Sequence, residues 1–114
     1  MEMDNIDPAV LEVIRLLGKK WGIPVLHLLE QSAMGFGEIK DILENISASV
    51  LSELLNEFTE KGILEKREIS LSPQRTAYFL TDFGKVYCQI IALIEEWGLD
   101  LVKRISKAQV RRTS

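Results

Sequence analysis

The fold is decided by residues 47–84, which read SASVLSELLNEFTEKGILEKREISLSPQRTAYFLTDFG. The first part of this stretch places four apolar side chains at the i, i+3, i+4 and i+7 spacing of one helical face, namely Leu51, Leu54, Leu55 and Phe58. Ser47 is suited to cap this helix, and Gly62 is suited to end it. We therefore expect a helix over residues 48–61 whose opposite face is free to meet a partner.

The second part of the same stretch predicts a β-hairpin followed by a new helix. Two strand-like segments, residues 63–69 and 75–80, flank a polar turn over residues 70–74 that is centred on Pro73. Thr81 is placed to cap the helix that follows. A helix, a two-stranded wing and a further helix in this order are typical of a winged helix-turn-helix.

Shorter helices are expected before this stretch. Asp7 followed by Pro8 is a favourable helix start, and the first helix should run to about Leu17. A second helix should begin near Trp21, and a short third helix should cover residues 38–43. The side chains expected to point inward from the third helix are Ile39, Ile42 and Leu43.

The last helix is expected to be long and to carry an apolar stripe. The stripe consists of Phe83, Val86, Ile90, Ile94, Trp97 and Leu101, and it continues to Ile105. A helix of this length cannot bury its whole stripe against one small domain, so its far end should pack on another subunit, together with the first helix. The expected dimer-interface residues are Leu11, Ile14, Ile90, Ile94, Trp97 and Leu101.

Length and composition favour one small globular domain. The chain has 114 residues, of which 46% are hydrophobic and 27% charged. We expect a single domain over residues 1–114, with an ordered core over 6–105 and a flexible basic tail over 106–114. The fold class should be α+β, mainly α: a winged helix-turn-helix with a two-stranded wing and a long C-terminal dimerisation helix. No apolar run approaches a membrane span of about 20 residues, and the N-terminal residues lack the pattern of a signal peptide, so we expect no membrane partner and a cytoplasmic location.

The charge is distributed unevenly along the chain. The net charge is −3 and the pI is about 5.2, which argues against a general coat for nucleic acid. Basic side chains nevertheless gather in and around the wing, at Lys61, Lys66, Arg67, Arg75 and Lys85. A body that is acidic on balance can still bind DNA through such basic edges, because salt limits the reach of each charge to about 10 Å.

Six short motifs then follow one another along the chain. They are Gly18-Lys19-Lys20-Trp21, Phe36-Gly37-Glu38-Ile39, Ile46-Ser47, Lys61-Gly62-Ile63-Leu64, Tyr78-Phe79-Leu80-Thr81-Asp82-Phe83-Gly84 and Glu96-Trp97-Gly98. With these motifs, from about Leu11 to Trp97, the chain resembles the HxlR family of transcriptional regulators, which are small relatives of the MarR group. The resemblance implies a winged-helix homodimer that binds near-palindromic double-stranded promoter DNA.

The resemblance also implies roles for individual residues. The helix over residues 48–61 would enter the major groove, and the recognition-helix candidates are Ser47, Ser49, Ser52, Glu53 and Asn56. The wing would reach the neighbouring backbone or minor groove, and its phosphate-binding candidates are Lys66, Arg67 and Arg75. Lys19 and Lys20, before the second helix, are secondary phosphate candidates.

Two features depart from the family pattern. Members typically carry Lys or Arg on the outer face of the recognition helix, whereas this chain carries Glu53 and Glu57, and carboxylates repel phosphate. Glu53 can still accept a hydrogen bond from cytosine. Redox-sensing members use a cysteine ahead of the first helix, and this sequence has none there, which disfavours thiol sensing by that route.

The sequence therefore favours a dimeric, sequence-specific DNA-binding transcriptional regulator. The alternative is a winged-helix protein-interaction module that has lost DNA binding and uses its acidic recognition-helix face to hold a basic partner. An enzyme is the least favoured class, because we find no paired acid and base, nucleophile constellation or phosphate loop.

The rarer residue types carry little chemistry of their own. One cysteine, Cys88, and one histidine, His27, cannot form a disulfide or a Cys/His metal set, so no metal or cofactor is expected. Cys88 should be a small core residue, and His27 a partly exposed or packing residue. Trp21 and Trp97 are expected as core and interface aromatics, with a small-molecule effector site in a dimer groove as the alternative.

Overall fold

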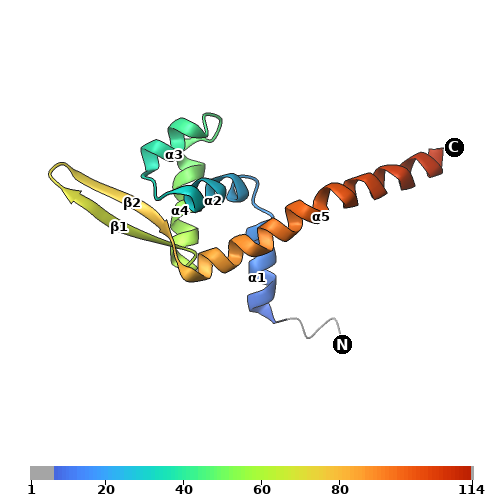
Figure 1. Cartoon of the computed structure of the whole chain (residues 1–114), viewed down its shortest axis with the longest axis horizontal. Coiled ribbons are helices and arrows are strands. Elements are labelled where there is room, and N and C mark those ends of the chain that lie inside the picture. The colour runs from blue at the N-terminus through green and yellow to red at the C-terminus, as the bar shows by residue number, and fades with distance from the viewer. Residues whose placement is uncertain (1–6, 114) are drawn as a thin grey trace.

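The protein is a winged helix-turn-helix body from which one long helix projects (Figure 1). The computed structural model describes residues 7–113, and its side chains through residue 108. The elements are α1 (Pro8–Leu17), α2 (Gly22–Gln31), α3 (Phe36–Ile42), α4 (Ala48–Glu60), β1 (Leu64–Leu71), β2 (Gln74–Leu80) and α5 (Asp82–Thr113). This order confirms the expected mainly helical α+β fold. The Cα radius of gyration is 17.6 Å, against about 13 Å for a compact domain of this size, because α5 and the wing extend in opposite directions.

Helix α4 begins and ends as its sequence indicates. The Ser47 hydroxyl accepts a hydrogen bond from the backbone N–H of Val50 at 3.2 Å, which satisfies one of the free amides of the first turn. The chain leaves the helix through Gly62, which has a φ of +77°. Glycine adopts this left-handed conformation at little energetic cost. The buried side chains of the helix are Leu51, Leu54, Leu55 and Phe58, the set expected from the spacing.

The wing is a two-stranded antiparallel hairpin that is buried at its base and exposed at its tip. Leu64 lies opposite Leu80 at the base, and Leu71 lies opposite Gln74 at the tip, beside a cis peptide bond between Ser72 and Pro73. The segment between α2 and α3 adds a short bridge, in which Tyr78 N–H donates to the Met34 carbonyl at 2.8 Å. The sequence did not indicate this bridge. It attaches the base of the wing to the helical body.

The junction between the wing and α5 depends on the Thr81-Asp82-Phe83-Gly84 turn. The Thr81 hydroxyl accepts from the backbone N–H of Gly84 at 2.9 Å, which caps the helix, and it can donate to the carbonyl oxygen of Ile63 at 3.1 Å. A Cβ atom at Gly84 would overlap that same carbonyl oxygen. Glycine is therefore required at this point by close approach of the two backbones.

One hydrophobic core lies between the helical body and the first turns of α5. Residues Tyr87, Cys88 and Ile91 attach α5 to this core, and the Tyr87 and Phe58 rings meet edge to face with centroids 6.4 Å apart. Val25, Leu26, Ile39, Ile46, Leu51, Leu55 and Ile63 fill its centre. Within residues 7–113, none of the helices combines the length and the apolar character that a membrane span requires.

Three local expectations differ from the structure. Helix α3 begins at Phe36 rather than at residue 38, and only Ile39 is buried on it. The expectation that Ile42 points inward was wrong, because Ile42 is 53% exposed: a helix of seven residues turns only one side chain fully into the core. Helix α5 continues to Thr113 instead of ending near Ile105.

Candidate nucleic-acid interface

The outward face of α4 is polar and accessible. Ser49, Glu53 and Asn56 are exposed and lie opposite the buried leucines, since residues three and four apart share a helical face. Ser52 is exposed at the edge of this face. Ser47 differs from the other candidates because its hydroxyl is already used as the helix cap. The structure thus brings four of the five recognition-helix candidates onto one free surface.

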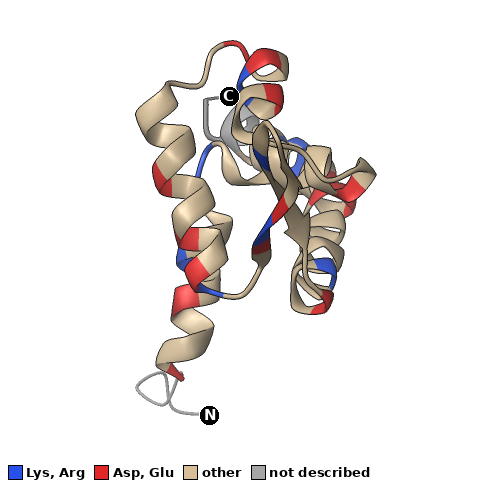
Figure 2. Ribbon diagram, turned by 90° about the vertical axis from the view of Figure 1, so that its left-hand side faces the viewer, with Lys and Arg blue, Asp and Glu red and all other residues tan. Residues whose placement is uncertain are grey.

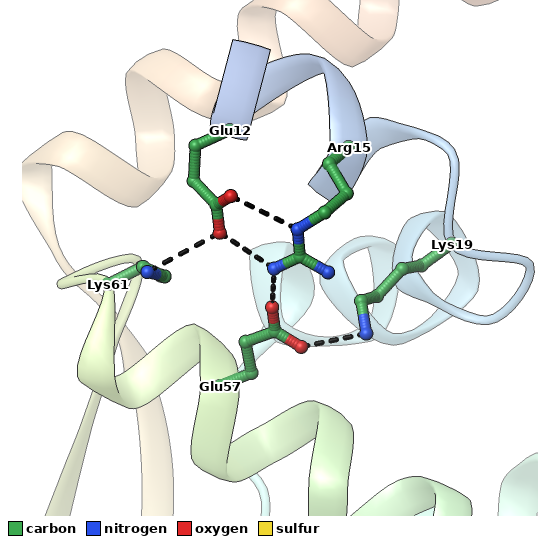
Figure 3. Close-up of polar contacts among 5 residues, drawn as sticks. All are labelled: Glu12, Arg15, Lys19, Glu57 and Lys61. Atoms are coloured by element: carbon green, nitrogen blue, oxygen red, sulfur yellow. Dashed lines mark hydrogen bonds and ion pairs between the residues drawn. The ribbon is translucent and has the colours of Figure 1, made fainter. Parts of the chain in front are cut away.

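Glu57 does not belong to that free surface. Its side chain is 20% exposed, and its two oxygens are held by Arg15 of α1 and by Lys19, whose Nζ lies 2.7 Å from Glu57 Oε2 (Figure 3). Lys19 and then Arg15 lower the pKa of the Glu57 carboxyl by hydrogen bonding. The prediction that Glu57 lies with Glu53 on the free outer face was therefore wrong. The charge of Glu57 is compensated by Arg15 and Lys19. The residue spacing within α4 could not indicate this, because Arg15 comes from α1.

The two lysines before α2 have different surroundings. Lys19 is engaged by Glu57, so it is less available for phosphate than the sequence suggested. Lys20 is exposed, with its Nζ 5.4 Å from the centroid of the Trp21 ring. A shallow hollow of about 210 Å³ lies between this segment and α4, and its lining residues are Lys19, Lys20, Trp21, Val50, Glu53 and Leu54.

The three basic candidates of the wing also differ. Arg67 pairs with Glu65 at 2.8 Å and lies 4.8 Å from the Phe79 ring centroid. This pairing lowers the pKa of Glu65. Lys66 lies beside the Tyr78 ring at 5.8 Å.

Arg75 is the candidate with the freest charge. It is paired with Ser70 in the hairpin register, close to the tip, and no carboxylate of residues 7–108 lies within ion-pair distance of it. Together with Ile69 and Thr76 it borders an open groove of about 420 Å³ between the wing and the start of α3. Figure 2, viewed from the side of the wing, shows acidic and basic positions interspersed along the ribbon.

The expected dimer residues are all on the surface of the protomer. On α1, Leu11 is 50% and Ile14 57% exposed, and on α5 the most exposed of the set are Trp97 and Leu101, each at 58%. At the near end of the stripe, Phe83 and Val86 are half exposed as well. The reason is that α5 turns a different face inward, through Tyr87, Cys88 and Ile91. The stripe lies beside that face and is left uncovered along its whole length.

The remaining titratable side chains do not form a reactive site. Cys88 is a core residue as expected, and burial raises the pKa of its thiol to about 12, which makes it a poor nucleophile at neutral pH. His27 is partly exposed as expected, and its Nε2 lies 2.6 Å from Glu95 Oε1, a link between α2 and α5 that the sequence did not indicate. Within the described part of the chain, no group of His, Cys, Asp and Glu could hold a metal ion.

Comparison with known proteins gives one consistent result. The family model described as HxlR-like helix-turn-helix matches residues 16–106. The HTH-type transcriptional regulator YvaP of Bacillus subtilis (strain 168) is 30% identical over 102 residues, with 90% of this chain and 94% of YvaP covered. The crystal structure of diamide-treated YodB from B. subtilis superposes with a TM-score of 0.76 at 26% identity, covering 84% of this chain and 95% of that chain. The reduced form of the redox regulator HypR, at 23% identity and a TM-score of 0.74, covers 87% of this chain and 98% of that chain and supports the fold alone.

Proposed function

The chain belongs to the HxlR family of helix-turn-helix proteins, and from this premise we propose that it is a transcriptional regulator that binds a specific duplex DNA sequence as a homodimer. The observation that carries the proposal is the free polar face of α4 beside a wing arginine with an uncompensated charge. Relatives of similar length are named transcriptional regulators, and none of those compared above is an enzyme. A cytoplasmic location, where the DNA of a bacterium or archaeon is accessible, belongs to the same proposal.

Sequence reading is assigned to α4. A helix fits the major groove of B-DNA, where short polar side chains reach the base edges. Asn56 can pair with adenine through its amide, and Glu53 can accept a hydrogen bond from the amino group of cytosine. Ser49 and Ser52 can bind either type of base edge, whereas Ser47 acts indirectly, by capping the helix.

Phosphate binding is assigned to the wing and to the start of α2. Arg75 near the hairpin tip can reach the backbone or the narrow minor groove next to the site that α4 occupies. Lys66 and Arg67 are weaker contributors, because each already interacts with neighbouring side chains. Lys20 is the better placed of the two lysines before α2, since Glu57 engages Lys19.

The homodimer is supported by the uncovered apolar surface of α1 and α5. From Phe83 to Ile105 the stripe extends about 33 Å along the helix, at about 1.5 Å per residue. Monomeric proteins rarely expose apolar patches of this extent, and a second copy offers the same stripe in reverse direction. A twofold dimer would present two α4 helices to successive major grooves about 34 Å apart, which matches a near-palindromic operator. A small-molecule effector is not assigned, because the hollow beside Trp21 adjoins the DNA-facing surface rather than the stripe.

The alternative of a protein-interaction module without DNA binding is less well supported. It was motivated by the acidic face of the recognition helix, with Glu53 and Glu57, and by the low pI. Glu53 is the one that remains exposed, since Glu57 is paired within the protein.

The proposal is tested by binding of the purified protein to a duplex selected from a random pool, against a scrambled duplex, by fluorescence anisotropy over a salt series. Specific binding should weaken with salt, and Arg75→Ala should weaken it further on both duplexes while lowering the salt slope by about 1. Lys103→Ala, which removes one positive charge from the far part of α5, is the matched control and should change neither quantity. If no duplex is enriched and none binds at low salt, the proposed function is wrong.

A further inference from the structure

A five-residue ion-pair cluster joins the dimer-forming helix to the recognition helix. It consists of Glu12, Arg15, Lys19, Glu57 and Lys61. Figure 3 shows these side chains pointing toward one another from α1, from the loop between α1 and α2, and from α4 and its C-terminal end. Among the described residues, no other salt bridge connects α1 to α4. The backbone between these two helices runs through α2 and α3, so the cluster is the direct polar connection between them.

Arg15 is the centre of this cluster. Its Nε and Nη2 atoms donate to the two oxygens of Glu12 at 3.1 and 2.7 Å, which fixes the plane of the guanidinium. The same Nη2 donates to Glu57 Oε1, while Lys19 holds Oε2. Lys61 Nζ lies 3.4 Å from Glu12 Oε1 and closes the arrangement on the α4 side. Each carboxylate is therefore held from two directions, which defines a geometry more strictly than one exposed ion pair does.

The cluster remains charged throughout the neutral range. Arg15 is the main cause that lowers the pKa of the Glu12 carboxyl, to about 2. The pKa of Glu57 is lowered by Lys19 and then Arg15. The pKa of Arg15 is raised by its hydrogen bonds to Glu12 and then Glu57. The connection between α1 and α4 is thus permanent at neutral pH rather than a proton-operated switch.

Glu57 occupies a special place on α4. It lies on the flank of the helix between the buried leucines and the exposed face, and it is less exposed than Ser49, Glu53 or Asn56. The next residue along α4, Phe58, packs on Tyr87 of α5. The same turn of α4 therefore contacts both helices that carry the uncovered apolar surface, through Arg15 on α1 and Tyr87 on α5.

We propose that Glu57 is a positioning residue for DNA reading: held by Arg15, it fixes the angle of α4 relative to α1 and so sets the half-site spacing that the dimer accepts. This inference rests on the proposed function. A base-reading group must be held within about 0.5 Å and 10–20° of its working geometry, and one base pair of added spacing rotates the second half-site by about 34°. Loss of the Glu57 contact should therefore relax the spacing preference before it affects the ability of one α4 helix to read its half-site.

The experiment measures the affinity of wild type and variants for the selected operator and for versions with one base pair inserted or removed between the half-sites. Wild type should lose about tenfold or more on each altered duplex. Glu57→Gln should bind the operator about tenfold more weakly than wild type does. Its affinity for each altered duplex should be less than about threefold below its own affinity for the operator. Glu60→Gln, which removes one negative charge from an exposed position three residues further along α4, is the charge-matched control and should keep the wild-type spacing preference.

Arg15→Gln approaches the same contact from α1 and should reproduce the effect of Glu57→Gln. If the two residues act through each other, the double variant should be no worse than either single variant. Denaturant unfolding of each variant is measured in parallel. A variant with lower stability but unchanged spacing preference would overturn the proposal, because the Arg15–Glu57 pair would then only stabilise the fold.

The remaining outcomes also decide the matter. Tighter binding of Glu57→Gln with unchanged spacing preference would mean that Glu57 is simply a carboxylate that repels phosphate, and the positioning role would be wrong. Absence of specific binding by wild type would instead overturn the proposed function itself. The wild-type measurement therefore separates failure of the function from failure of this inference.

Discussion

The two sides of this small protein differ in the side chains that they offer to a partner. The side formed by α4 and the wing exposes polar and charged groups, with serine, asparagine and glutamate on the helix and Arg75 near the hairpin tip. The side formed by α1 and the far part of α5 exposes large apolar side chains, including Trp97 at 58% and Leu101 at 58%. The first surface suits a hydrated polyanion and the second suits a dry protein interface. In the proposed function, one chain thus keeps its DNA-binding surface apart from its dimerisation surface.

Substitution in the apolar stripe should have the largest effect. Trp97→Asp would place a carboxylate in the proposed interface, and an unpaired charge there costs at least about 3 kcal/mol, or about 100-fold in the dimer dissociation constant. The molar mass measured by light scattering at micromolar concentration should fall to that of a monomer, and operator binding should be lost with it.

The matched control for this substitution is Leu99→Asp. Leu99 is also exposed on α5 but lies about 200° around the helix from Trp97, because each residue turns the helix by about 100°. It should remain dimeric. A Trp97→Asp protein that stays dimeric would show that another surface forms the dimer.

The next largest effect concerns the junction that holds the two sides together. Gly84→Ala would place a methyl group against the Ile63 carbonyl, so α5 must shift relative to the wing, at a cost of about 1–3 kcal/mol in the free energy of unfolding. Urea denaturation measures this directly. Gly37→Ala, where an added Cβ meets no atom within 4 Å, should be neutral or slightly stabilising. Equal stability of the two variants would contradict the close approach at Gly84.

A smaller effect on DNA affinity should distinguish base reading by α4 from phosphate binding by the wing. Asn56→Ala should weaken binding to the selected operator by about tenfold, because one base-edge contact is lost. Its affinity for scrambled DNA and its salt slope should stay at wild-type values, in contrast to the uniform loss expected for Arg75→Ala. Anisotropy titrations on both duplexes distinguish the two patterns. If Asn56→Ala lowered the affinity for both duplexes equally, Asn56 would not be a base-reading residue.

The smallest effect is a pH dependence of stability from the ion-pair cluster. The folded-state pKa of Glu12 is about 2, below the ordinary value of 4.5, so the unfolded chain binds more protons between these values. The contribution of Glu12 is therefore fully present above about pH 4.5 and is lost as the pH falls through 2. Urea midpoints measured from pH 6 to pH 2.5 should decline less steeply for Glu12→Gln than for wild type. Parallel declines would mean that Glu12 is not held by Arg15 in solution.

The sequence predicted the elements because their signals are local. The spacing of Leu51, Leu54, Leu55 and Phe58, the cap at Ser47 and the positive φ at Gly62 all act within one helix or at its ends. The same is true of the Thr81 cap on α5. Such local signals predicted α4, the wing and the start of α5 to within two residues.

The sequence was less informative where two distant segments meet. The Glu12 and Arg15 pair could have been expected from its i, i+3 spacing on one helix, but nothing local indicates that Arg15 also reaches Glu57 across 42 positions of the chain. The Met34–Tyr78 bridge and the His27–Glu95 contact belong to the same class. The error about Ile42 has a related cause, because the depth of the core beneath a short helix is set by its neighbours.

By itself, the sequence determined the order of helices and strands, the caps that bound them, the polar outer face of α4 and the apolar stripe of α5, because each depends on side-chain spacing along one segment. The tertiary structure alone decided which face of α5 turns toward the body and that Glu57 is paired with Arg15 and Lys19. The physical reason is that the environment of a side chain at the edge of a helical face depends on which other segment packs there, and that packing is a property of the whole fold.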